Sequence, residues 1–181
     1  DSFCFVACAD CLLVWFLDGM ADAEDPDYEA PFEPIELPGD KEAIRRYCQS
    51  PVSGRLEWIQ AEIYPKHLHS GTDLTEEMED YLFESVDMGE RDEPSMIIHK
   101  SIGGRGDVFW NIFPMGTTFD VDTYDDEVES TVFHAVKTTD RPATVTVRFL
   151  FKTPEHTKPY KLLYRVELPT GDYIENELIN A

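Results

Sequence analysis

Two segments near the C-terminal end place apolar residues at every second position, and this pattern constrains the fold more than any other feature. The alternating positions are Ala143, Val145, Val147, Phe149 and Phe151 in the first segment, and Tyr160, Leu162, Tyr164, Val166 and Leu168 in the second. A period of two is typical of a strand with one buried face. Because only the short polar PEHTKP segment separates the two runs, they predict a β-hairpin, with a further short strand after Gly171.

Two other segments have helical spacing. Residues 119–137 place Val121, Tyr124, Val128, Val132 and Ala135 on one face and load acidic residues into the first turns, where the helix dipole favours them. Residues 74–88 predict a second helix, with Asp73 and Glu76 as a capping pair and Gly89 at its end. We expect a short helix at 40–48, whereas 53–68 is compatible with helix or strand. The predicted fold class is therefore α+β, a twisted antiparallel sheet with helices packed on it.

Charge limits the classes of partner. The chain has 181 residues, 42% of them hydrophobic, which is enough for one domain with a substantial core. Acidic residues number 37 against 15 basic ones, giving a formal net charge of −22 that is concentrated in residues 1–93. Such a field repels polyanions, so nucleic acid and anionic membrane surfaces are unfavourable partners.

The four cysteines all lie in the first 48 residues, at Cys4, Cys8, Cys11 and Cys48. An even number confined to one region favours two disulfides and an oxidising compartment, with a metal site as the alternative. The apolar run 3–17 is interrupted by Asp10 and too short to span a bilayer, so we expect a secreted, extracellular protein without a membrane segment. As a single domain, 1–181 divides into a Cys-rich segment with an acidic Pro-rich strap (1–48), a helical region (49–94) and a core (95–181).

Three short motifs then occur in a fixed order: Ile-Ile (97–98), GGRGD (103–107) and NIFPM (111–115), followed by the predicted helix and hairpin. In this order and spacing, residues 95–170 resemble the DNA/RNA non-specific endonuclease domains of secreted and toxin-type nucleases, in the ββα-metal (His-Me finger) superfamily. The resemblance implies a ββα-metal nuclease-like core with a substrate site along the motif loop.

The positions that would perform the chemistry differ from that family. The histidine that acts as general base corresponds to Met96, whose thioether cannot accept a proton. The asparagine that holds the metal corresponds to Gly116, which has no ligating side chain. His99 lies three residues after Met96, and an odd offset on a strand would point it to the opposite face. The sequence therefore predicts a pseudoenzyme without a metal or other cofactor.

The predicted function is that of a secreted, non-catalytic binding or structural protein on a degenerate nuclease scaffold. Its partner would be a basic protein, or a small apolar molecule in a cleft formed by Met96, Asp107, Trp110, Asn111 and Phe113. One alternative is an active metal-dependent nuclease with relocated groups, namely His99, Asp107 and Asn111. Another is an acidic nucleic-acid mimic that inhibits a DNA-binding protein.

Overall fold

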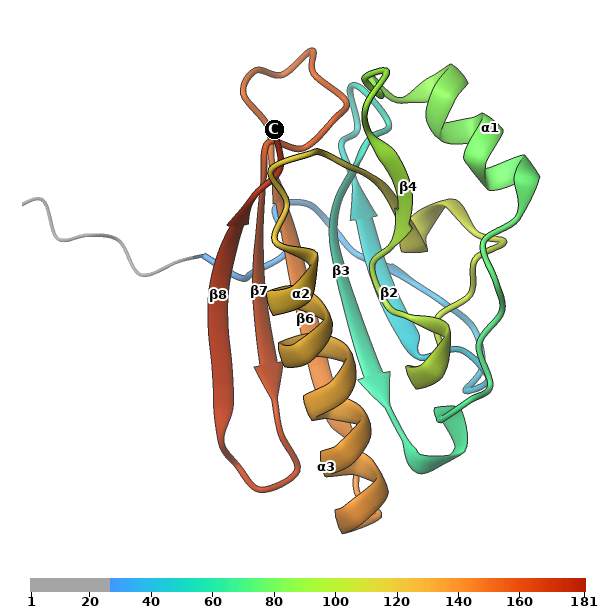
Figure 1. Cartoon of the computed structure of the whole chain (residues 1–181), viewed down its shortest axis with the longest axis vertical. Helices are drawn as coiled ribbons and strands as arrows, with labels where there is room; N and C mark the ends of the chain where they lie inside the picture. Colours follow the sequence, from blue (N-terminus) through green and yellow to red (C-terminus); the bar gives the residue numbers. More distant parts are fainter. Residues whose placement is uncertain (1–26) are drawn as a thin grey trace, which may run out of the picture.

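The computed structural model describes residues 27–181, and its main element is a six-stranded antiparallel sheet (Figure 1). The strand order is β1-β2-β3-β6-β7-β8. The strands are β1 (Ile35–Glu36), β2 (Ile44–Gln49), β3 (Leu56–Ile63), β6 (Ala143–Leu150), β7 (Lys161–Glu167) and β8 (Tyr173–Ile179). The α+β class predicted from the sequence is confirmed.

The predicted hairpin forms the centre of the C-terminal half of this sheet. In β6 and β7, Val147 pairs with Tyr164 and Val145 pairs with Val166, and all four side chains are buried. The predicted last strand is β8, which pairs along the whole of β7. Alternation alone was sufficient here because one face of each strand is almost completely buried, whereas the other face is only partly covered.

One long helical stretch crosses the inner face of the sheet (Figure 1). It consists of α2 (Val121–Tyr124), the π-helical segment η4 (Asp125–Ser130) and α3 (Thr131–Thr139). Tyr124, Val128, Val132 and Val136 point into the core. The sequence predicts Ala135 on that face, but Val136 is buried there instead. The difference arises because the wider turns of a π-helix shift the buried register by one residue.

The region before residue 94 differs from the sequence prediction. Residues 44–49, expected as part of a helix, form β2, and the ambiguous 53–68 segment forms β3 followed by the 3-10 turn η1 (Pro65–His67). Helical spacing in 40–48 is a weak local preference, and it is overridden because the segment pairs with β3 from Ile44 to Gln49, with two irregularities in the register. The helical-region description of 49–94 is therefore wrong in its first half.

The first long helix, α1 (Glu76–Ser85), starts after Thr75 and stops at Val86, so it is shorter than predicted. The Asp73 carboxylate does not cap it and pairs with Lys100 instead. Following α1, β4 (Glu93–Met96) and β5 (Ile112–Met115) form a separate two-stranded sheet. The turns η2 (Lys100–Ile102) and η3 (Phe109–Asn111) lie between these two strands.

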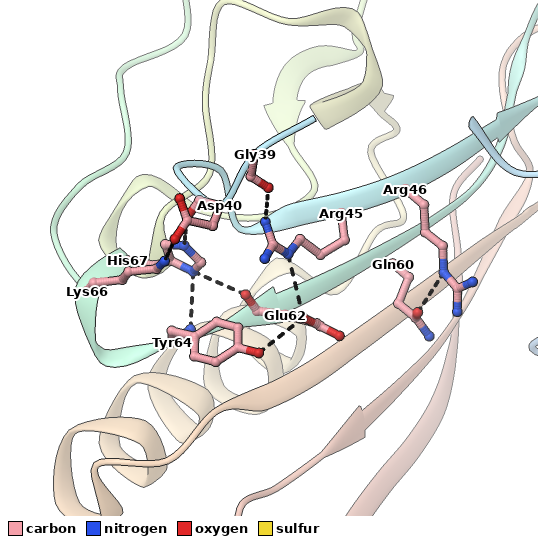
Figure 2. A network of polar contacts seen from close by, with 9 residues as sticks. All are labelled: Gly39, Asp40, Arg45, Arg46, Gln60, Glu62, Tyr64, Lys66 and His67. Atoms are coloured by element: carbon pink, nitrogen blue, oxygen red, sulfur yellow. Dashed lines mark hydrogen bonds and ion pairs between the residues drawn. The ribbon is translucent and has the colours of Figure 1, made fainter. Parts of the chain in front are cut away.

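A buried histidine fixes the corner after β3 (Figure 2). The His67 ring is 1% exposed, and its Nε2 lies 3.0 Å from the Asp40 carbonyl oxygen. Its Nδ1 accepts a hydrogen bond from the Tyr64 backbone amide at 3.1 Å. Gly103, at φ +92°, packs against this ring where a Cβ atom would come within 2.7 Å of His67 Cβ. His67 therefore joins the entry to β2 and the motif loop.

The N-terminal side of the domain is described from Asp27 onward. Trp58 Nε1 donates to the Tyr28 carbonyl at 2.8 Å, and Arg148 pairs with Asp27, so this part of the proline-rich segment lies against β3 and β6. Cys48 is a fully buried free cysteine, and burial raises the pKa of its thiol. Among residues 27–181 Cys48 has no disulfide partner, and Cys4, Cys8 and Cys11, which would supply one, lie outside the described residues, so the disulfides stay a prediction. None of the helices in 27–181 combines the length and apolar character needed to cross a membrane.

Candidate binding cavity around Met96 and His99

A cavity of about 280 Å³ lies between the end of β4 and the α2–η4 helical stretch. Met96, at the end of β4, and His99, which precedes η2, line it from one side. Tyr124, Asp125 and Glu129 line it from the helix. The expectation that His99 faces away from Met96 is wrong. The strand ends at Met96 and the chain then turns, so the alternation of a strand does not extend to residue 99.

His99 is oriented by a carboxylate. Its Nδ1 lies 2.7 Å from Glu129 Oε1, which also accepts a hydrogen bond from the Ser101 hydroxyl at 2.6 Å. A carboxylate can only accept, so the short contact with Glu129 favours a proton on Nδ1 over the longer contact, 3.4 Å, in which Nδ1 would accept from the Ser101 amide; Nε2 is then the basic nitrogen. The His99 side chain is 43% exposed, and this nitrogen is therefore open to a partner in the cavity or to water.

The cavity has an excess of negative charge. Three carboxylates line it, from Asp73, Asp125 and Glu129, against a single ammonium group, from Lys100, which pairs with Asp73. Desolvation raises the pKa of Asp125, and the neighbouring Glu129 carboxylate raises it further. Repulsion between these groups is relieved when a cation approaches them.

The loop residues expected in the same cleft are separated in the structure. Asn111 is completely buried, and its amide makes three backbone hydrogen bonds, one with the Ile98 amide, one with the Ile98 carbonyl and one with the Arg105 carbonyl. Asp107 forms a two-point ion pair with Arg105, which lowers the pKa of its carboxyl group. Neither side chain lines the cavity around Met96, so the fallback set His99, Asp107 and Asn111 does not assemble.

The aromatic members of the predicted cleft also lie elsewhere. Trp110 stacks on Tyr47, with ring centroids 5.2 Å apart and planes 9° apart. Phe113 is buried in the core and borders a second cavity, which residues of α1, η3, β5 and β6 line. Of the five residues assigned to one cleft, only Met96 lines the acidic cavity.

Gly116 has a structural role that excludes a side chain. Its amide donates to Asn180 Oδ1 at 2.7 Å, and a Cβ atom would come within 2.6 Å of the Ala181 carbonyl oxygen. The end of β8 therefore occupies the space that a ligating side chain would need. Within residues 27–181, no group of three His, Cys, Asp or Glu side chains is arranged to hold a metal ion.

Sequence reasoning missed Asp125 and Glu129 as members of the site. Their spacing of four residues places both on one face of a helix, and that signal was present in the sequence. From the sequence alone, the helix dipole is a sufficient explanation for these acidic residues, because nothing local indicates that His99 turns back toward this face of the helix.

The fold combines a β-hairpin, a motif loop and a helix packed over an antiparallel sheet. No protein-family model matches the sequence, and a comparison with curated proteins finds no significant match. Among solved structures, the chain is similar to one described as Sda1 nuclease with bound zinc ion, with a TM-score of 0.56. The two are 15% identical, and the match covers 76% of this chain and 75% of the other. The protein therefore has a nuclease-like fold.

Proposed function

We propose that this protein is a non-catalytic binding protein on a nuclease-like fold, and that the acidic cavity receives a cationic side chain of a basic partner protein. The observation that carries the proposal is the composition of that cavity. A thioether, Met96, stands where the resemblance to non-specific nucleases would require an imidazole base, and carboxylates outnumber the cationic groups around it.

Electrostatics favour a guanidinium or ammonium group over a phosphodiester. A phosphate group entering the cavity would meet Asp125 and Glu129 without an uncommitted cation, since Lys100 pairs with Asp73. An arginine side chain could instead form charge-assisted hydrogen bonds with the same carboxylates. The net charge of −22 adds long-range attraction for a basic protein and long-range repulsion for nucleic acid.

The test must separate binding in the cavity from general attraction to an acidic protein. We would measure the affinity of a hexa-arginine peptide for the native chain and for two charge-matched double variants. Asp125→Asn/Glu129→Gln removes two charges inside the cavity, whereas Glu76→Gln/Glu77→Gln removes two exposed charges on α1. We expect at least about a tenfold loss for the cavity variant and about twofold for the α1 variant. Equal losses in both variants would contradict a specific site.

A second function is favoured by one observation, the orientation of His99 by Glu129 at 2.7 Å. A carboxylate on Nδ1 with Nε2 open is the arrangement of a general base, so a nuclease with a relocated base is the competing proposal. Plasmid nicking with magnesium or manganese distinguishes the two. Our proposal predicts no cleavage at high protein concentration, and cleavage that disappears in His99→Ala would replace it with the nuclease.

A further inference from the structure

A second cavity, of about 150 Å³, lies between α1 and the strands β5 and β6. It shares no lining residue with the acidic cavity. Its apolar lining is formed mainly by Tyr81, Leu82, Phe109, Phe113, Pro114 and Phe149, while Ser53, Arg55, Ser85 and Thr157 contribute polar groups. These side chains come from α1, η3, β5 and β6, so the cavity is a product of tertiary packing.

The helix α1 packs on the rest of the domain through few buried side chains, which leaves this space beneath it. Leu82 is the only residue of the helix that is fully buried, while Phe83 is 60% exposed. Tyr81 is half-buried and approaches Phe109 with ring centroids 6.1 Å apart. The helix therefore covers the cavity with one fully buried side chain, and a space left unfilled loses van der Waals contacts along its walls.

Polar contacts hold the surrounding loops in place, and two of the residues that make them, Arg55 and Thr157, also line the cavity. The segment after β6 is fixed by Arg55, whose Nη1 donates to the carbonyls of Thr153 and His156 at 2.9 and 2.6 Å. The Asp87 amide donates to the Thr157 hydroxyl at 2.8 Å, which ties the end of α1 to the same segment. The cavity is therefore preformed, and a ligand that enters it does not have to order these loops.

From these observations we propose that this cavity is a binding site for a small aromatic molecule that carries one hydroxyl group, in the manner of a phenol. Its volume is comparable to that of the engineered cavity of about 150 Å³, lined by leucine, isoleucine and phenylalanine, that binds benzene. Phe109 and Phe113 offer ring edges and faces to an aromatic guest. The Tyr81 hydroxyl is one of the polar groups of the lining, and within residues 27–181 it makes no hydrogen bond to another residue.

Phenol and benzene are the probes, and calorimetric titration is the measurement. We expect saturable binding of both to the native chain at one site per molecule, with phenol the tighter ligand. Tyr81→Phe removes only the hydroxyl, so it should weaken phenol binding about five- to tenfold and leave benzene binding within about twofold. Equal weakening of both ligands, or no change in either, would overturn the assignment of Tyr81.

A filling variant tests the location of the site. Val86→Phe places a ring at the wall of this cavity and should abolish binding of both probes. Val121→Phe is the matched control, since Val121 lines the acidic cavity instead, and it should bind both probes as the native chain does. Absence of saturable binding to the native chain, or unchanged binding to Val86→Phe with its fold verified by circular dichroism, would refute the proposal.

Discussion

Replacing Asn111 by alanine tests whether this residue supports the motif loop or belongs to a reactive site. The resemblance to nucleases places an asparagine here among the conspicuous motif residues, and it was a candidate catalytic group if the protein were active. In the structure its side chain is 0% exposed and bonds only to backbone atoms of Ile98 and Arg105. We therefore expect a large loss of stability and no specific loss of ligand binding.

The magnitude follows from the groups left without partners. Asn111→Ala would orphan one amide, that of Ile98, and two carbonyls, those of Ile98 and Arg105, whose bonds measure 2.7, 2.9 and 2.8 Å. Each buried unsatisfied group costs about 1 to 3 kcal/mol. A water molecule in the vacated space can restore part of this, so we expect the free energy of unfolding to fall by about 3 to 5 kcal/mol.

Urea titration followed by tryptophan fluorescence measures this loss. Asn176→Ala is the matched control. Asn176 is half-buried, donates to Glu127 at 3.1 Å and accepts from the exposed Glu177 amide at 2.8 Å, and water can replace both bonds, so its loss should cost about 1 kcal/mol. Asn111→Asp gives a second comparison, since it keeps the shape but sets a carboxylate against two carbonyls, and it should be at least as damaging as alanine at pH 7. If Asn111→Ala unfolds within about 1 kcal/mol of the native chain, the supporting role is wrong.

Three further variants test other contacts, each by urea titration. Gly104→Ala would bring a Cβ within 1.6 Å of the Ile98 carbonyl oxygen and should cost more than about 3 kcal/mol or prevent folding. Gly54→Ala is its control: Gly54 has φ +72° but open space around it, so the variant should cost about 1 kcal/mol. Similar losses in the two variants would contradict the close approach at Gly104. His67→Ala removes the bonds that hold the corner after β3 and should cost about 2 to 4 kcal/mol, and a near-neutral result would mean that the corner is stable without the ring. Asp125→Asn should stabilise the fold at pH 7 by only a few tenths of a kcal/mol, since solvent screens this exposed group. Because the pKa of Asp125 is raised in the folded state, its ionised form opposes folding at pH values above the unfolded-state pKa. At lower pH the carboxyl group is protonated in both the folded and the unfolded state, so the gain in stability from Asp125→Asn should vanish. A gain that persists there would contradict the electrostatic cause.

The sequence by itself determined the elements whose signal lies within one segment. The alternation in 143–151 and 160–168 identified β6 and β7, since a strand with one buried face must place apolar residues at every second position. Helical spacing identified the α2–α3 stretch and the existence of α1, with errors only at the ends and after the π-helical segment. The order of the glycine and NIFPM motifs also indicated the nuclease-like fold.

The tertiary structure decided everything that depends on segments far apart in the chain. Residues 44–49 became a strand because β3 was available to pair with them, which no local pattern records. His99 turned toward Met96 because the chain leaves the strand at that point, and Glu129 reached its imidazole from a helix 30 residues later. Four neighbouring loop residues have different environments in the folded protein. Asn111 supports the backbone and Asp107 pairs with Arg105. Trp110 stacks on Tyr47, and Phe113 lines a separate cavity. Spacing along a loop fixes which residues are close in the chain, whereas burial and hydrogen bonding decide which of them face the same space.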